Sequence, residues 1–253
     1  MKKFTTSQIV QTALFIALAI VVRQFSFMIP FGGTNGMRIG VSEVFTKMPA
    51  LLFGPVLGGV ASGLVDWLSQ LIKAEGAYLL PILFVMILGG FTTGVLWKIM
   101  KNADTKKLRI AFFTVCLFLA VFGAVNHVVL SFNINGGFYT LLSSLGDKSS
   151  FATYGMYFAS VLGWLFLLAD FLIRKKSADY SEDFFPLVIT IFASDFVVTT
   201  LNTFVLRYFY SGLAKIPFLT YYLPRVLQDV ISAIVFAYII SALLKIYRKV
   251  IKR

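Results

Sequence analysis

Long apolar tracts alternate with short polar segments along almost the whole chain. A helix that spans a bilayer needs roughly 20 mostly apolar residues, because each residue rises about 1.5 Å through a hydrocarbon layer of about 30 Å. Six tracts meet or approach this length, and they run over residues 7–27, 80–100, 109–131, 151–173, 184–206 and 224–245. The pattern therefore predicts six transmembrane helices.

A seventh apolar tract, residues 41–72, is interrupted in its first half by proline and glycine. Glycine ends helices readily, and proline is tolerated best in a first helical turn. We expect two short helices here, over 43–54 and 56–72, that turn at Gly54-Pro55. Helices shortened in this way are tolerated where they line a protein interior or a cavity.

The composition agrees with this pattern. Of the 253 residues, 58% are hydrophobic and only 13% are charged. This hydrophobic fraction exceeds what the core of one soluble domain requires. The sequence therefore predicts an all-α integral membrane protein, a helical bundle of about eight transmembrane segments in a lipid bilayer. The net charge of +12 would favour nucleic acid in a soluble protein, but its distribution along this chain indicates topology, and no nucleic-acid partner is expected.

Most lysines and arginines lie in four clusters at segment ends. The clusters are Lys2 and Lys3; Lys98, Lys101, Lys106, Lys107 and Arg109; Arg174, Lys175 and Lys176; and Lys245, Arg248, Lys249, Lys252 and Arg253. All four lie on one side if residues 41–72 cross the membrane twice. The positive-inside rule then predicts a multi-pass protein of the cell membrane with both termini cytoplasmic.

Polar side chains follow one face of three predicted helices. The stripes are Gly59, Gly63 and Asp66; Asp195, Thr199 and Asn202, with Thr203 adjacent; and Arg225, Gln228, Asp229 and Ser232. Residues spaced by three, four or seven positions share a helix face. An ionisable group in lipid is costly unless it meets a partner or a wet cavity. Interhelical ion pairs, for example between Asp66 and an arginine, are one explanation of the stripes.

A binding pocket is the other explanation. Arg38, Asn202 and Arg225 lie near the outer ends of their segments, so they predict a pocket that opens outward. Guanidinium and amide donors suit an anionic or amide-rich ligand.

Catalytic and cofactor motifs are not recognisable. The single cysteine, Cys116, gives no disulfide or metal-ligand spacing, and no GxxxxGK[ST] phosphate loop occurs. We expect His127 to be a packed, hydrogen-bonded residue and Asp170 to pair locally or meet water. We therefore predict no catalytic residue, metal or cofactor, and any ATPase would be another chain.

Two blocks of sequence resemble a known family. "RIGVSEVFTKMPALLFGPVLGGVASGLVDWLSQLI", followed by "GAYLLPILFVMILGGFTTGVLWK", and "TTLNTFVLRYFYSGLAKIPFLTYYLPRVLQDVI" are similar to the substrate-binding S-components of energy-coupling factor (ECF) vitamin transporters, most closely the folate type. The match covers roughly residues 7–101 and 184–247.

The resemblance implies a non-enzymatic, six-helix subunit that binds a water-soluble vitamin, folate-like by preference, from outside. It implies as partners a transmembrane scaffold subunit and two cytoplasmic ATPases. Four-residue spacing of alanines is usually ordinary packing, but the resemblance marks Ala13 and Ala17 as the scaffold-docking face. The substrate-binding candidates, from the resemblance and the polar stripes together, are Arg38, Asp66, Tyr78, Asn202, Thr203, Arg225 and Gln228.

The chain departs from the folate-type pattern in two places. Residues 102–183 predict an inserted transmembrane hairpin within one transmembrane domain, 1–253, whose core is 1–101 and 184–253. Glu43 and Lys47 also stand where the folate type is usually apolar. Two other functions stay open: a self-sufficient secondary transporter, with Asp66, Asp195 and Asp229 as proton or cation sites, and a membrane enzyme that modifies lipids.

Overall fold

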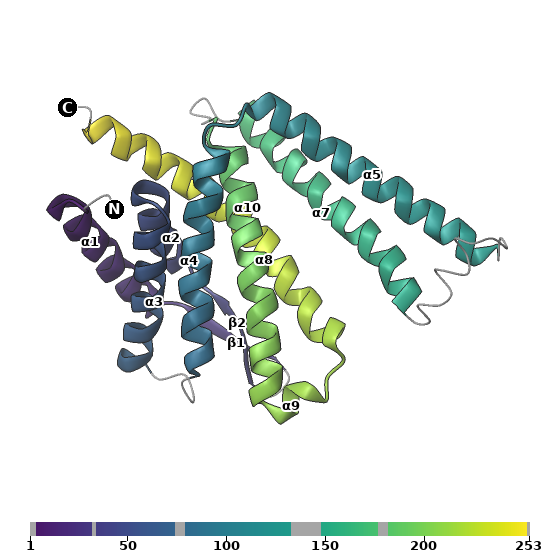
Figure 1. Ribbon diagram of the computed structural model, residues 1–253, viewed down its shortest axis with the longest axis horizontal. Helices are drawn as coiled ribbons and strands as arrows, with labels where there is room; N and C mark the ends of the chain where they lie inside the picture. Colours follow the sequence, from purple (N-terminus) through teal and green to yellow (C-terminus); the bar gives the residue numbers. More distant parts are fainter. Residues whose placement is uncertain (1–3, 32–33, 74–78, 133–147, 177–181, 252–253) are drawn as a thin grey trace. The chain divides into compact units, whose positions relative to one another are not determined.

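The computed structural model describes residues 4–31, 34–73, 79–132, 148–176 and 182–251 (Figure 1). It divides into two compact units, Met1–Asn102 with Ser181–Arg253, and Ala103–Tyr180. This division falls near the predicted boundaries. That the second unit is an insertion into a six-helix core stays a prediction.

The first unit is a helical bundle with one small hairpin. Its elements are α1 (Thr6–Arg23), β1 (Phe27–Phe31), β2 (Thr34–Ile39), α2 (Ser42–Phe53), α3 (Pro55–Ile72), α4 (Leu80–Met100), α8 (Phe184–Phe209), α9 (Ser211–Ala214) and α10 (Phe218–Ile251). A capping box between Thr5 and Gln8 begins α1. The Tyr247 hydroxyl donates to the Gln11 side chain at 2.5 Å, which places the last turns of α10 beside the first turns of α1.

The predicted turn at Gly54-Pro55 is confirmed. Gly54 has φ +100°, a left-handed conformation that a side chain disfavours, and its amide donates to the Ala50 carbonyl. Pro55 occupies the first position of α3, where a missing N–H costs no helical hydrogen bond. The chain therefore reverses directly between two helices that pack against each other.

Glycines bring α3 and α4 into backbone contact, as the small-residue spacing predicts. A Cβ atom at Gly90 would collide with the Gly58 carbonyl oxygen and the Ser62 hydroxyl. A Cβ atom at Gly58 would in turn meet Ala50 of α2. Three helices thus pack closely around a few positions that lack side chains.

Two connections between helices contain structure that the sequence does not predict. Residues expected to form a loop after the first helix pair as an antiparallel hairpin, β1–β2, with a register irregularity between Ile29 and Pro30. Aromatic and β-branched residues favour strands, and the irregularity occurs where proline cannot donate to the ladder. In the last turn of α8, the Arg207 side chain donates to carbonyls of the segment that follows, those of Leu213, Ala214 and Ile216.

The last helix is longer than expected. We predicted that it begins at Pro224, but α10 starts at Phe218 and holds the proline inside. At this seventh position of the helix proline cannot donate the i→i−4 hydrogen bond, a loss that transmembrane helices tolerate where neighbouring groups satisfy the freed carbonyl. The helix also continues beyond the predicted end at 245, through the basic residues to Ile251.

The second unit is a helical hairpin of α5 (Thr105–Ser131) and α7 (Lys148–Lys176). Arg109 forms an ion pair with Asp170 at 2.7 Å, so Asp170 pairs locally, as expected. Cys116 is buried against Gly163. His127 is exposed and contacts the Tyr154 and Tyr157 rings, rather than packing in an interior.

Seven of the described helices, α1, α3, α4, α5, α7, α8 and α10, are long and apolar enough to cross a membrane. The eighth predicted segment is α2, whose 12 residues rise only about 18 Å. Seven of those 12 residues are buried in the bundle. The predicted all-α membrane bundle is confirmed, with the β1–β2 hairpin added at one of its connections.

Candidate functional site

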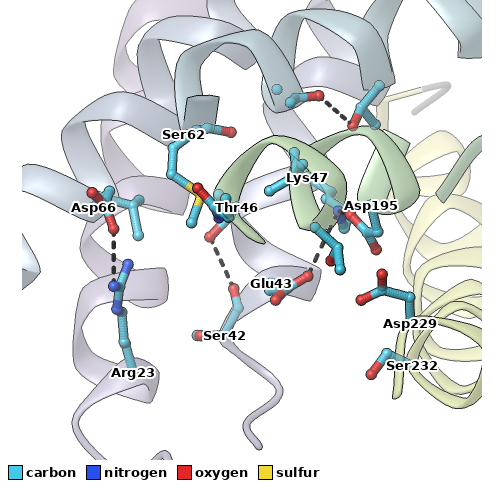
Figure 2. A pocket seen from close by; sticks show the side chains of 18 of the residues that line it. Arg23, Ser42, Glu43, Thr46, Lys47, Ser62, Asp66, Asp195, Asp229 and Ser232 are labelled. Carbon is cyan, nitrogen blue, oxygen red and sulfur yellow. Dashed lines mark hydrogen bonds and ion pairs between the residues drawn. The ribbon is translucent and has the colours of Figure 1, made fainter. Parts of the chain in front are cut away.

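A polar pocket of about 200 Å³ lies inside the first unit (Figure 2). Its walls come from α1, α2, α3, α4, α8 and α10. Fifteen of the twenty lining residues are polar: Arg23, Ser42, Glu43, Thr46, Lys47, Ser62, Asp66, Thr93, Asp195, Thr199, Asn202, Arg225, Gln228, Asp229 and Ser232. Such a concentration of polar groups inside an apolar bundle makes this pocket the candidate functional site.

One wall is closed by an ion pair between α1 and α3. The Arg23 guanidinium donates to the Asp66 carboxylate at 3.0 Å, and only 15% and 8% of these side chains are exposed. Arg23 is the last residue of α1, and Asp66 lies on the glycine-containing face of α3. The ion-pair explanation of Asp66 is therefore confirmed, and the carboxylate also lines the pocket.

A second ion pair joins α2 to α8. The Lys47 ammonium donates to the Asp195 carboxylate at 2.5 Å and lies 3.6 Å from Glu43, one helical turn earlier (Figure 2). Lys47 and Asp195 are each 8% exposed, whereas the Glu43 side chain is half exposed. A buried cation is thus neutralised by one buried and one accessible carboxylate.

The α8–α10 wall carries a further arginine. Arg225 donates to the Thr203 hydroxyl at 3.0 Å, and its guanidinium lies 5.2 Å from the centre of the Tyr221 ring. Thr203 is fully buried behind the pocket wall and donates to the Thr199 carbonyl. These contacts fix the direction of the Arg225 head group while it still lines the pocket.

Three buried polar atoms of the lining have no hydrogen-bond partner among the residues that the structure describes. They are the amide oxygen Oδ1 of Asn202, the carboxylate oxygen Oδ2 of Asp229 and the Nε of Arg23. Buried polar groups are almost always hydrogen-bonded, and leaving one unpaired costs free energy. The pocket therefore offers two hydrogen-bond acceptors and one hydrogen-bond donor to a ligand.

The predicted site residues divide into three groups. Asp66, Asn202, Arg225 and Gln228 line the pocket, and Thr203 supports Arg225 from behind. The backbone of Arg38 pairs with Met28 in the hairpin. The Arg38 side chain and all of Tyr78 lie outside the described residues, so their roles stay predictions.

Several lining residues were not selected from the sequence as binding residues. Arg23 falls inside the first predicted span, 7–27, and was not singled out, whereas Glu43 and Lys47 were noted only as departures from the folate-type pattern. Asp195 and Asp229 were recognised in polar stripes but not placed in the site. All five residues are ionisable groups inside apolar segments. Selecting every such group as a candidate would have included them in the predicted site.

The side chains of this pocket offer a mixture of hydrogen-bond donors and acceptors. Among the described residues, no three histidine, cysteine or acidic side chains form a group that could hold a metal ion. The ionisable side chains of the lining are three cations and four acids, and they come from α1, α2, α3, α8 and α10. Such a mixture of donors and acceptors fits a small polar molecule that forms many hydrogen bonds.

Comparison with known proteins identifies the family. A family model described as "ECF-type riboflavin transporter, S component" matches residues 3–140, more than half of the chain. The chain belongs to this family. No curated protein and no solved structure matches it.

As an ECF S component, the protein is a membrane-embedded substrate-binding subunit of a transporter and not an enzyme. Family membership also implies that it works with scaffold and ATPase subunits. The lipid-modifying alternative is thereby excluded. The polar pocket is the candidate site for its substrate.

Proposed function

We propose that this S component captures a water-soluble vitamin with a fused nitrogen-containing ring, folate-like by preference. The observation that supports this proposal most directly is the pocket, in which buried polar atoms of Asn202, Asp229 and Arg23 have no hydrogen-bond partner among the described residues. Donors and acceptors placed around a ring edge give a polar heterocycle both orientation and specificity. Riboflavin is the second candidate, because it appears in the description of the matching family model.

Binding to a vitamin panel tests this proposal. Purified protein in lipid nanodiscs is expected to bind one member of a panel containing folate, riboflavin and other water-soluble vitamins, at one molecule per chain and without ATP. Isothermal titration calorimetry measures the affinity, and mass spectrometry of the denatured protein identifies a co-purified ligand. The absence of binding across the whole panel would contradict the proposal.

The vitamin enters, in this proposal, from the outer side of the cell membrane, with both termini in the cytoplasm. One scaffold subunit and two ATPases then drive its release inside. Uptake should require co-expression of those subunits. Uptake of the same rate in cells that lack them would instead favour a self-sufficient secondary transporter.

The exposed face of α1 is the proposed scaffold contact. Ala13 and Ala17 lie one turn apart and are both exposed, so they leave a shallow surface on which another helix packs closely. Replacing both by leucine is expected to reduce uptake and recovery of the scaffold with the S component by about tenfold or more, because the larger side chains hold the helices apart. Pull-down and uptake assays measure these effects.

The vitamin affinity of the Ala13→Leu/Ala17→Leu variant should equal that of the wild type, because neither alanine lines the pocket. Ala124→Leu is a matched control, since Ala124 is also exposed but lies on α5. Normal uptake by the double variant would remove this face from the proposal.

A further inference from the structure

The α10 side of the pocket carries a carboxylate that is unlike the other acids of the lining. Asp66 is paired with Arg23, and Asp195 is paired with Lys47. Within the described part of the chain, no ion pair joins Asp229 to a lysine or an arginine. Its Oδ2 atom is buried and accepts no hydrogen bond from the described residues.

The nearby cations have other partners. Lys47 contacts Asp195 and Glu43, so one positive charge already faces two negative ones. Arg225 points its guanidinium at Thr203 and Tyr221. Both cations interact with Asp229 only at longer range. The wall formed by α2, α8 and α10 therefore has three acids, Glu43, Asp195 and Asp229, beside two cations (Figure 2).

A second unpaired acceptor lines the same pocket as this carboxylate. Asn202 is 7% exposed, lines the same pocket, and has a buried Oδ1 atom that no described residue contacts through a hydrogen bond. Arg225, one turn before Asp229 on α10, donates to the hydroxyl of Thr203, the neighbour of Asn202 on α8. The two unpaired acceptors therefore belong to adjacent turns of neighbouring helices.

We infer that the Asp229 and Asn202 acceptors bind an amidine-type edge of the ligand, in which a ring N–H stands beside an exocyclic NH₂ group. A carboxylate accepts two parallel N–H bonds from such an edge, and the shared charge strengthens both. The third donor hydrogen of the edge is available to the amide oxygen of Asn202. This inference rests on the proposed function, since it specifies which heterocycle the pocket accepts.

The same wall disfavours a ring edge that carries two carbonyl groups. A dioxo edge places a carbonyl oxygen on each side of its single N–H, and these oxygens would face the carboxylate oxygens of Asp229 without a proton between them. One of the buried acceptors would then stay unpaired. Sites built to hydrogen-bond an N–H group reject analogues that lack it, because the groups of the protein are left without partners.

Two pteridines that differ in one substituent provide the test. Pterin has the 2-amino-4-oxo edge, whereas lumazine has the 2,4-dioxo edge. Both are measured by competition against the vitamin that binds best in the panel. The wild-type S component is expected to prefer pterin by about tenfold or more.

An Asp229→Asn variant should reduce this preference to about twofold or less, because the amide keeps the shape of the side chain but donates to a lumazine carbonyl as readily as it accepts from pterin. Asp183→Asn is the matched control, since Asp183 pairs with Arg248 and does not line the pocket. This control should keep the wild-type preference. Thermal unfolding verifies that both variants are folded, and the wild-type ratio tests the inference even if a variant is not.

Each other result counts against the inference. Equal competition, preference for lumazine, failure of pterin to compete, or a dioxo ring in the best vitamin would overturn the amidine assignment and leave vitamin binding intact. If no vitamin in the panel binds, the proposed function and this inference both fail.

Discussion

A Lys47→Met variant is expected to lose about 3–5 kcal/mol of folding stability, because it leaves a buried carboxylate without its cation. Asp195 is 8% exposed and has Lys47 as its ion-pair partner at 2.5 Å. Without Lys47, three acids, Glu43, Asp195 and Asp229, would remain at one wall of the pocket. Thermal unfolding of the detergent-solubilised protein, together with its yield from membranes, measures the loss.

Two further variants identify the cause of that loss. Lys98→Met makes the same substitution at an exposed position of α4 and should unfold close to the wild-type temperature. Adding Asp195→Asn to Lys47→Met removes the unpaired charge, so about half of the lost stability should return. A wild-type unfolding temperature for Lys47→Met alone would mean that this ion pair does not stabilise the bundle.

Gly90→Ala is expected to destabilise the protein by about 1–3 kcal/mol, although alanine is normally the better helix former. The added Cβ meets the Gly58 carbonyl and the Ser62 hydroxyl, and the carbonyl belongs to the backbone of α3, which cannot rotate away. The helices must therefore separate at a position that lines the pocket. Vitamin affinity should fall together with the unfolding temperature.

Gly155→Ala is the matched control for this close contact. A Cβ atom at Gly155 meets no atom within 4 Å, so the same substitution in α7 should keep or raise stability by up to about 1 kcal/mol. Calorimetry and ligand titration on both variants compare the two sites. Equal behaviour of the two alanine variants would contradict the α3–α4 packing described above.

Much of this bundle can be predicted from the sequence, because a membrane helix is determined by a continuous stretch of residues. Apolar length alone indicates the long spans, and the backbone preferences of Gly54 and Pro55 indicate the reversal between α2 and α3. The spacing of Gly59, Gly63 and Asp66 predicts a face that packs against a neighbour. That face does lie against α4, where Gly59 and Gly63 meet Ile87.

Pairing between distant residues could not be predicted in the same way. Lys47 and Asp195 are separated by 148 positions, and Arg23 and Asp66 by 43. Each stripe shows that its residues face an interior, but helix periodicity does not determine which neighbour supplies the opposite charge. The pocket therefore follows from the packing of six helices, and the unpaired atoms of Asn202 and Asp229 become visible only in that packing.

The Glu43–Lys47 contact has a consequence for the insertion of the nascent chain. Synthesis at roughly 5–20 residues per second places about 7–30 s between the appearance of Lys47 and that of Asp195, 148 positions later. During this interval Lys47 lacks its final partner, because Asp195 has not yet been made. Glu43, one turn earlier and 3.6 Å from Lys47 in the finished protein, supplies a temporary counter-charge within the same helix. Its half-exposed side chain therefore gives Lys47 a counter-charge that does not depend on α8, and it also lines the completed pocket.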